Sequence, residues 1–194
     1  TVDLVMNVPT LPLHPFQPQP DRTEFEDSKL GVEWQYLRNP NRENYSLTER
    51  KGYLRITASP FTLDETKAVS AILRRQTEHN FTAATRMLYS PSDNKDEAGI
   101  TMIQNNTHHY DLRLVKKGNT NVVQVLVRAG SIDYSAFEQS VTGNEIELKI
   151  EGTPLVYTFH YKTPNATEFQ ELGYMDTRYL STEVAGGFTG VMIG

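Results

Sequence analysis

The sequence contains no cysteine, no long apolar run and no concentrated basic stretch. Without cysteine, a disulfide scaffold, a thiol nucleophile and a cysteine-based zinc site are excluded, and the redox compartment stays open. Because no apolar run approaches the ~20 residues that a membrane-spanning helix needs, we expect no membrane partner. The net charge is −5, and the densest basic spots are Arg74-Arg75 and Lys116-Lys117. We therefore expect no nucleic-acid partner, since such proteins carry a basic stripe.

Motifs of catalysis and cofactor binding are also missing. The sequence has no Gly-x-Ser-x-Gly, no Gly-x-x-x-x-Gly-Lys and no His-x-His. The neighbours His108 and His109 point to opposite faces if they lie in a strand, so we interpret them as polar strand-end residues rather than as metal ligands. Acidic side chains are numerous and are expected to be solvated, although a glycosidase-like carboxylate pair leaves no trace in spacing. The acidic candidates are Glu24, Glu26, Asp27, Asp96, Glu97, Asp111, Glu138 and Asp176. The sequence predicts no catalytic residue and no cofactor.

Residues 1–20 differ from the rest in their spacing of proline. Prolines stand at Pro9, Pro12, Pro15, Pro18 and Pro20. Proline fixes φ and removes a donor, which predicts an extended segment outside any central strand. The interleaved Leu11, Leu13 and Phe16 favour a strap lying on a surface over a free linker. The start lacks a methionine and the basic region of a signal peptide. We expect the chain to be a piece of a larger protein, which leaves its location (periplasmic, secreted or cytoplasmic) open.

Residues 21–194 are predicted to form one all-β domain. The mean hydropathy is low, at −0.51, which favours half-exposed strands over thick buried helices. The predicted strands are 53–57, 71–76, 81–89, 99–104, 110–115, 122–127, 137–142, 146–150 and 156–161. Turn residues separate them at regular intervals, as is typical of an antiparallel sandwich. Gly143-Asn144 predicts a hairpin-type turn, and residues 63–71 are the best candidate for a helix.

Aromatic side chains offer a sugar-stacking platform, because apolar rings fit the C–H face of a pyranose. The candidates are Trp34, Tyr36, Tyr45, Tyr53, Tyr110, Tyr157 and Tyr161. The alternative is core filling. Tyr157, Phe159 and Tyr161 alternate and so share one face, for which we favour an inward orientation.

The segment Gly186-Gly187-Phe188-Thr189-Gly190 surrounds one large ring with glycine. Glycine permits tight or positive-φ backbone. Phe188 is thus suited to project from a loop and contact a ligand. A simple strand-entry residue is the other interpretation, and the sequence leaves both open.

Several short motifs follow one another in a specific order. They are Trp34-x-x-x-Arg38-Asn39-Pro40, Tyr45 to Arg50, Gly52 to Ile56, Arg74-Arg75-Gln76, Glu97 to Ile100, His108-His109-Tyr110 and Leu180 to Gly190. From about Asp21 to Gly194, this order resembles the C-terminal concanavalin A-like domain of family 43 glycoside hydrolases, the bacterial and fungal β-xylosidases and α-L-arabinofuranosidases.

The resemblance implies a two-sheet antiparallel jelly-roll sandwich over residues 21–194, with a final strand that continues past Gly194. It implies catalytic carboxylates on an N-terminal propeller, of which this chain holds no part, and it makes residues 1–20 the connection from that domain. It also implies that Phe188, in its loop with Gly186, Gly187 and Thr189, reaches the active-site mouth and contacts substrate. A structural calcium ion, as in some concanavalin-like folds, is left open.

Three roles are compatible with these observations. The chain is an accessory domain that shapes the pocket of a glycosidase for xylan- or arabinan-type polysaccharides, without activity of its own. Alternatively, it is an independent carbohydrate-binding, lectin-like module. A third role is assembly, with a homo-oligomer formed through a sheet face or the proline-rich strap. The preference for the first rests on analogy with a fold family.

Overall fold

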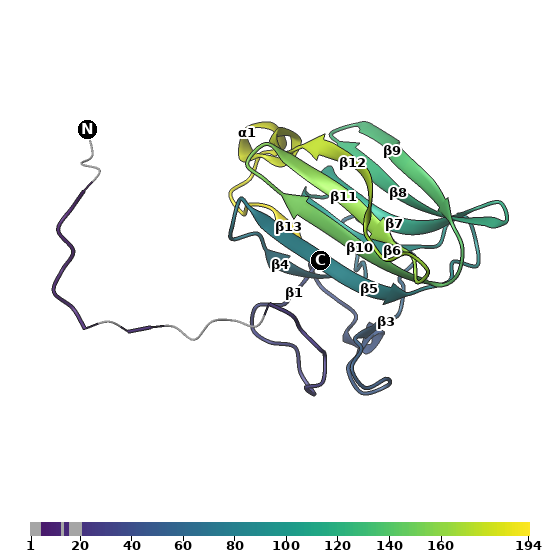
Figure 1. Cartoon of the computed structure of the whole chain (residues 1–194), viewed down its shortest axis with the longest axis horizontal. Coiled ribbons are helices and arrows are strands. Elements are labelled where there is room, and N and C mark those ends of the chain that lie inside the picture. Colours follow the sequence, from purple (N-terminus) through teal and green to yellow (C-terminus); the bar gives the residue numbers. More distant parts are fainter. Residues whose placement is uncertain (1–4, 13, 16–20) are drawn as a thin grey trace.

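The computed structural model describes residues 5–12, 14–15 and 21–194. These residues form a β-sandwich with a larger sheet, a smaller sheet and a short ribbon, all with antiparallel pairing (Figure 1). Across the larger sheet the strands are β1 (Gln35–Tyr36), β4 (Ile72–Arg75), β13 (Met192–Ile193), β6 (Glu97–Asn105), β7 (His108–Lys117), β8 (Thr120–Ala129) and β9 (Ile132–Val141). Across the smaller sheet they are β12 (Gln170–Asp176), β11 (Val156–Lys162), β10 (Glu145–Gly152) and β5 (Phe81–Leu88), and the ribbon pairs β2 (Tyr45–Ser46) with β3 (Arg55–Ile56). The helical turns are η1 (Arg42–Asn44), η2 (Thr177–Leu180) and α1 (Thr182–Ala185). The all-β sandwich predicted from the sequence is confirmed.

The core lies between the larger and smaller sheets. Successive strand residues point to opposite faces, so alternate residues of each central strand enter it. In β7 and β8 these are Tyr110, Leu112, Leu114, Val123, Val125 and Val127; in β10 and β11 they are Ile146, Leu148, Ile150, Tyr157, Phe159 and Tyr161. The inward orientation predicted for Tyr157, Phe159 and Tyr161 is confirmed, with exposed fractions of 3%, 0% and 7%.

The opposite face of the larger sheet is covered by residues 57–71. Gln124 and Leu126 of β8 point to this outer face and remain buried, at 3% and 8% exposure. The predicted helix over residues 63–71 is wrong, because residues 63–67 form turns and bends and residues 68–71 have no regular secondary structure. Local side-chain contacts replace helical hydrogen bonds: the Thr62 amide donates to a Glu65 carboxylate oxygen at 3.3 Å, and the Ser70 amide donates to Ser59 Oγ at 3.2 Å. Short polar side chains compete with helix formation in this way.

The turn at Gly143-Asn144 is present but does not form a hairpin. It follows β9 of the larger sheet and precedes β10 of the smaller sheet, so the strands it joins do not pair with each other. Gly143 has φ 89°, which suits a tight turn. The sequence signal for a turn was correct, while the assumption that its flanking strands pair was wrong.

Other elements were missed or predicted too short. Strand β12 lies at an edge of the smaller sheet and was not predicted; β9 begins at Ile132, five residues before its predicted start at Phe137. The β9 residues Ile132, Asp133, Tyr134 and Ser135 are exposed, without the one-sided burial that makes a strand visible in sequence.

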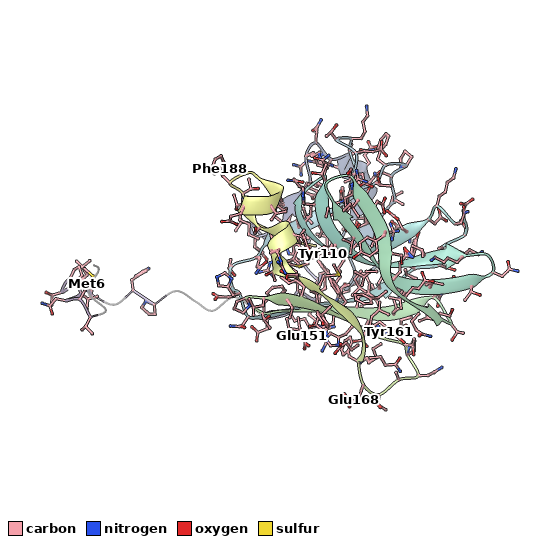
Figure 2. All side chains as sticks on the ribbon, turned by 90° about the horizontal axis from the view of Figure 1, so that it is seen from above. Met6, Tyr110, Glu151, Tyr161, Glu168 and Phe188 are labelled. Atoms are coloured by element: carbon pink, nitrogen blue, oxygen red, sulfur yellow. The ribbon has the colours of Figure 1, made fainter. Side chains whose placement is uncertain are left out.

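The described residues among the first 20 are exposed and run away from the sandwich (Figure 1). Met6 lies at a distance from both sheets in Figure 2. Exposed large apolar side chains here are Val5, Met6, Val8 and Leu11. Of the predicted strap, residues 1–4, 13 and 16–20, which include Leu13 and Phe16, lie outside the described residues. The strap as a connection that lies on another domain stays a prediction.

Candidate functional site: the Phe188 loop

The Phe188 loop, residues 186–190, lies between α1 and β13. The preceding turn η2 is fixed to the core by Leu180, which is 1% exposed. Asp176 accepts a hydrogen bond from the Arg178 amide at 2.9 Å and so caps the start of η2. The single turn α1 ends where the Gly186 amide donates to the Thr182 carbonyl at 2.9 Å. The loop therefore starts from a fixed point on the sandwich.

Glycine determines the path of the loop. Gly186, Gly187 and Gly190 have φ values of 74°, 83° and 71°, which place them in the positive-φ region that side chains rarely adopt. Phe188 is 102% exposed, and its ring points away from both sheets (Figure 2). It also lies four residues before β13. The ring thus projects from the loop and does not enter a strand, while its contact with a ligand stays a prediction.

Further apolar side chains are exposed close to the loop. Tyr179 of η2 and Val184 of α1 are 40% and 49% exposed, and Leu155 is 75% exposed. Leu155 belongs to the same end of the sandwich, because its carbonyl accepts a hydrogen bond from the Thr177 amide at 3.0 Å. We call Leu155, Tyr179, Val184 and Phe188 the apolar end surface.

The aromatic platform suggested by the sequence is not assembled. Tyr110, Tyr157 and Tyr161 are buried in the core. The remaining four rings, Trp34, Tyr36, Tyr45 and Tyr53, are half-buried. Arginine guanidinium groups lie over three of them: Arg74 over Trp34, Arg42 over Tyr36 and Arg50 over Tyr53, at 5.3, 4.7 and 4.0 Å from the ring centroids. An arginine guanidinium therefore lies over one face of each of these three rings.

A second group of functional side chains lies under residues 57–71, on the outer face of the larger sheet. His109 is 1% exposed. Its Nδ1 lies 2.9 Å from an Asp111 oxygen and its Nε2 lies 3.3 Å from Asp64 Oδ1. Thr101 Oγ1 donates to Asp111 at 2.6 Å, and Arg128 Nε lies 3.3 Å from Asp64. We call these five residues the outer-face network.

The surroundings of His109 in this network favour its charged form. Burial lowers the pKa of His109, but the hydrogen bonds and negative charges of Asp111 and Asp64 outweigh it, so the pKa is raised above its usual value. Burial raises the pKa of the nearby Glu97 despite its ion pair with Arg113. The Thr101 hydroxyl is already donated to Asp111, so the network lacks a free nucleophile. It fastens the covering segment to the sheet.

His108 and His109 both lie in β7 but contact different residues. His108 Nδ1 lies 3.1 Å from Thr107 Oγ1 in the turn between β6 and β7, whereas His109 belongs to the outer-face network. Burial, followed by the positive charges of His109 and Arg128, lowers the pKa of His108. Within residues 5–12, 14–15 and 21–194, no group of three or more His, Asp or Glu side chains is arranged to hold a metal ion.

The other acidic candidates take part in turns and ion pairs. Asp96 accepts hydrogen bonds from Ser92 and Asp93 in one turn, Glu138 pairs with Lys117, and Asp176 pairs with Arg178. Glu24 pairs with Arg22, and Glu26 and Asp27 are exposed.

An open hollow of about 630 Å³ adjoins Glu97, Arg113 and Gln124, but its lining contains no aromatic ring. None of the helices in the described ranges is long and apolar enough to span a bilayer.

Sequence reasoning missed the residues around the Phe188 loop. Hydrogen bonds to the loop and its flanks come from Arg75, Gln104 and Asn105, which lie 80 or more residues away along the chain. Such contacts leave no local spacing signal.

The fold and sequence match known proteins. The family model of the beta xylosidase C-terminal concanavalin A-like domain matches residues 22–194. A non-reducing end alpha-L-arabinofuranosidase of Bacteroides ovatus, BoGH43B, is 35% identical over 188 residues, which are 96% of this chain and 35% of that relative. A solved structure of Bacteroides ovatus GH43B, from a xyloglucan utilisation locus, superposes with a TM-score of 0.89 at 34% identity and covers 96% of this chain and 37% of that one. A xylan beta-1,4-xylosidase structure from Bacillus halodurans shares the fold, with a TM-score of 0.90 at 24% identity over 96% of this chain and 37% of that one.

The chain thus spans about a third of the length of the relatives that it matches. The matched part of the family 43 proteins is their C-terminal domain. The chain belongs to the family of β-xylosidase C-terminal concanavalin A-like domains.

Proposed function

We propose that this chain is the accessory sandwich of a family 43 glycosidase that acts on xylan- or arabinan-type plant polysaccharides. In this role, Phe188 forms one wall of the active-site pocket of a propeller catalytic domain. The observation that carries the proposal is the full exposure of Phe188 on a short loop with a defined backbone. The family supplies the reaction class, and the acids of that reaction belong to the propeller.

The chemistry of an exo-acting glycosidase suits such a division of labour. Enclosing one sugar in a blind pocket excludes water and strengthens electrostatic interactions within it. A phenyl ring supplies an apolar wall without adding an acid or base. Burying a phenylalanine side chain contributes about 1.5–3 kcal/mol relative to leaving it in water. Phe188 gains that stabilisation when the pocket forms around it.

The apolar end surface supports the same orientation. Leu155, Tyr179 and Val184 are exposed at the same end of the sandwich as the Phe188 loop. In the proposed assembly this end of the sandwich faces the propeller, and the proline-rich segment connects the two domains. Packing against the propeller would cover these side chains.

The test uses the full-length protein that contains this chain. We expect Phe188→Ala to lower kcat/KM for an aryl β-xyloside or α-L-arabinofuranoside about 10- to 100-fold, the equivalent of the lost burial. Val32→Ala is the matched control, because Val32 is 99% exposed and lies outside the apolar end surface. Unchanged kinetics in Phe188→Ala would contradict the pocket role.

The isolated 194-residue chain provides a separate test of the accessory role. We expect no hydrolysis of either aryl glycoside, because the catalytic carboxylates belong to the propeller. Hydrolysis by the purified chain would refute this role. Calorimetric titration with xylo- and arabino-oligosaccharides addresses the lectin-like alternative, for which measurable binding by the isolated chain is required.

A further inference from the structure

We propose that Arg75, Gln104 and Asn105 are positioning residues that hold the Phe188 loop in the shape that presents the ring. The inference rests on the proposed function of Phe188 and deepens it, because it names the side chains through which the sandwich fixes the pocket wall. It follows from hydrogen bonds at both ends of the loop.

The start of the loop is held by two neighbouring residues of β6. Asn105 Nδ2 donates to the Ala185 carbonyl at 2.9 Å, and Gln104 Nε2 donates to the Gly186 carbonyl at 3.1 Å. Carbonyls at the end of a helical turn lack partners within the turn. These side-chain amides satisfy them and attach α1 to the larger sheet.

The end of the loop is held by β4. The Arg75 guanidinium donates to the Thr189 carbonyl at 2.7 Å. The Gln76 amide then donates to the Val191 carbonyl at 3.0 Å, and β13 continues by pairing with β4 and β6. Phe188 thus lies between carbonyls that are fixed on either side. The loop itself contains three positive-φ glycines, whose backbone has the most freedom to lose on ordering.

A local irregularity allows neighbouring strand residues to reach the same loop. Adjacent residues in a regular strand point to opposite faces, yet Gln104 and Asn105 both donate to carbonyls at the start of the loop. The register between β6 and β7 shifts between Ile103 and Asn105. A bulge of this kind re-aims a side chain, and bulges are frequent next to functional sites. The shift places both amides toward α1.

Asn105 is oriented by a second set of hydrogen bonds. Its Oδ1 accepts from the amide and the hydroxyl of Thr107, both at 2.9 Å. The side-chain oxygen is therefore occupied by the turn, which leaves Nδ2 to donate to Ala185. The adjacent Asn106 provides a natural comparison, since its Nδ2 donates to the Asp64 carbonyl at 3.1 Å in the covering segment instead.

Preorganisation is the physical benefit of these contacts. A free loop that becomes ordered on binding loses backbone conformational entropy. A loop that is ordered beforehand avoids that loss when substrate enters. Arg75, Gln104 and Asn105 act through Phe188 and do not themselves touch substrate.

The first experiment measures loop order in the 194-residue chain. Residue 188 is replaced by 4-fluorophenylalanine, and ¹⁹F relaxation reports the mobility of the ring. Asn105→Asp keeps the acceptor for Thr107 and removes the donor to Ala185, so we expect faster ring motion. Asn106→Asp is the matched control, with the same change in the same turn, and should leave the ¹⁹F signal unchanged. Arg75→Met, at an exposed position on another strand, tests the other end of the loop if Asn105→Asp fails to fold.

The second experiment is a double-mutant cycle in the full-length protein. We expect Asn105→Asp to raise KM about 3- to 10-fold, in line with the loss of one hydrogen bond, with a smaller change in kcat. In the Phe188→Ala background the same substitution should have no further effect, because it acts through the ring. A general loss of stability would instead lower activity in both backgrounds.

The outcomes separate this inference from the proposed function. Additive effects of Asn105→Asp and Phe188→Ala, or an unchanged ¹⁹F signal in both Asn105→Asp and Arg75→Met, would overturn the positioning role. If the ring becomes mobile in these variants while Phe188→Ala leaves the kinetics unchanged, the anchoring contacts stand and the pocket role of Phe188 fails.

Discussion

The two faces of the larger sheet bury their side chains by different means. The same strands supply both faces through alternate residues. On the inner face, Leu112 and Val125 are fully buried among apolar neighbours of the smaller sheet. On the outer face, His109 and Asp111 are almost as buried, at 1% and 8% exposure, where Asp64 of residues 57–71 contacts His109. Burial alone therefore does not distinguish these faces; the chemistry of what covers them does.

The smaller sheet and residues 57–71 are therefore held against the larger sheet by different kinds of interaction. Apolar packing between sheets is non-directional and depends on area and volume. The outer-face network depends on direction and charge, since buried polar groups are costly unless each has a partner. In residues 57–71, directional contacts such as that between Asp64 and His109 therefore add to the burial of apolar side chains such as Val69.

The largest expected effect comes from removing core volume on the inner face. Phe159→Ala should lower the free energy of unfolding by about 3–5 kcal/mol, through lost transfer free energy and the cavity left behind. Urea unfolding of the isolated chain measures it. Phe188→Ala is the matched control in the same assay, because the ring is fully exposed; its effect should stay within about 0.5 kcal/mol. Similar losses in both variants would contradict the packing described for the core.

A smaller effect is expected from the outer face. Asp111→Ala leaves His109 and Thr101 without their shared acceptor, and should lower the free energy of unfolding by about 1–3 kcal/mol. Arg86→Ala removes an ion pair with Glu145 at 2.7 Å whose arginine is 53% exposed, and should cost about 0–1 kcal/mol. If the exposed pair proves as important as Asp111, the outer-face network is not what fastens the covering segment.

The third prediction concerns pH and is the smallest. Because the folded-state pKa of His109 is raised above its ordinary value of 6.5, its charged form stabilises the fold. That contribution is complete below the unfolded pKa and is lost as pH rises through the folded pKa. The urea midpoint should therefore fall as pH increases above 6.5.

His109→Gln isolates this contribution from those of its neighbours. The groups facing His109 are Asp64, Asp111 and, more distantly, Glu97 and Arg128. The pKa of His108 is lowered, so its contribution is lost as pH falls, in a window below that of His109. The decline above pH 6.5 should be weaker in His109→Gln than in the natural chain. Equal slopes in both proteins would show that His109 does not titrate as inferred.

Much of the fold could be predicted because the alternation of residues along each strand and the turn residues between strands are local sequence patterns. Alternation at Tyr157, Phe159 and Tyr161 predicted both a strand and its buried face. The helix expected at 63–71 was wrong. Asp64 in this segment contacts His109 and Arg128, which lie far along the chain, and local sequence does not reveal these contacts. Strand pairing was likewise beyond reach: Gly143-Asn144 signalled a turn but not the change of sheet that follows it.

The candidate site also has some features that the sequence indicated and others that only the structure revealed. The glycines around Phe188 allowed a projecting ring but left a strand-entry residue equally open, whereas the order of motifs indicated the family. The side chains that hold the loop could not be predicted from the sequence. Arg75 and Thr189 are 114 residues apart, and ordinary polar residues on strands carry no distinctive sequence pattern. Local backbone freedom can be inferred from sequence, whereas its restriction by distant donors requires the structure.

The position of β13 has a consequence for the order of events during protein synthesis. This strand joins β4 to β6 in the larger sheet, and it is made after every other strand of that sheet. A nascent chain that has not yet released residues 192–193 from the ribosome cannot connect β1 and β4 to the rest of the sheet. The Phe188 loop is closed by that same strand, so the ring is displayed in this shape only after β13 has joined the sheet.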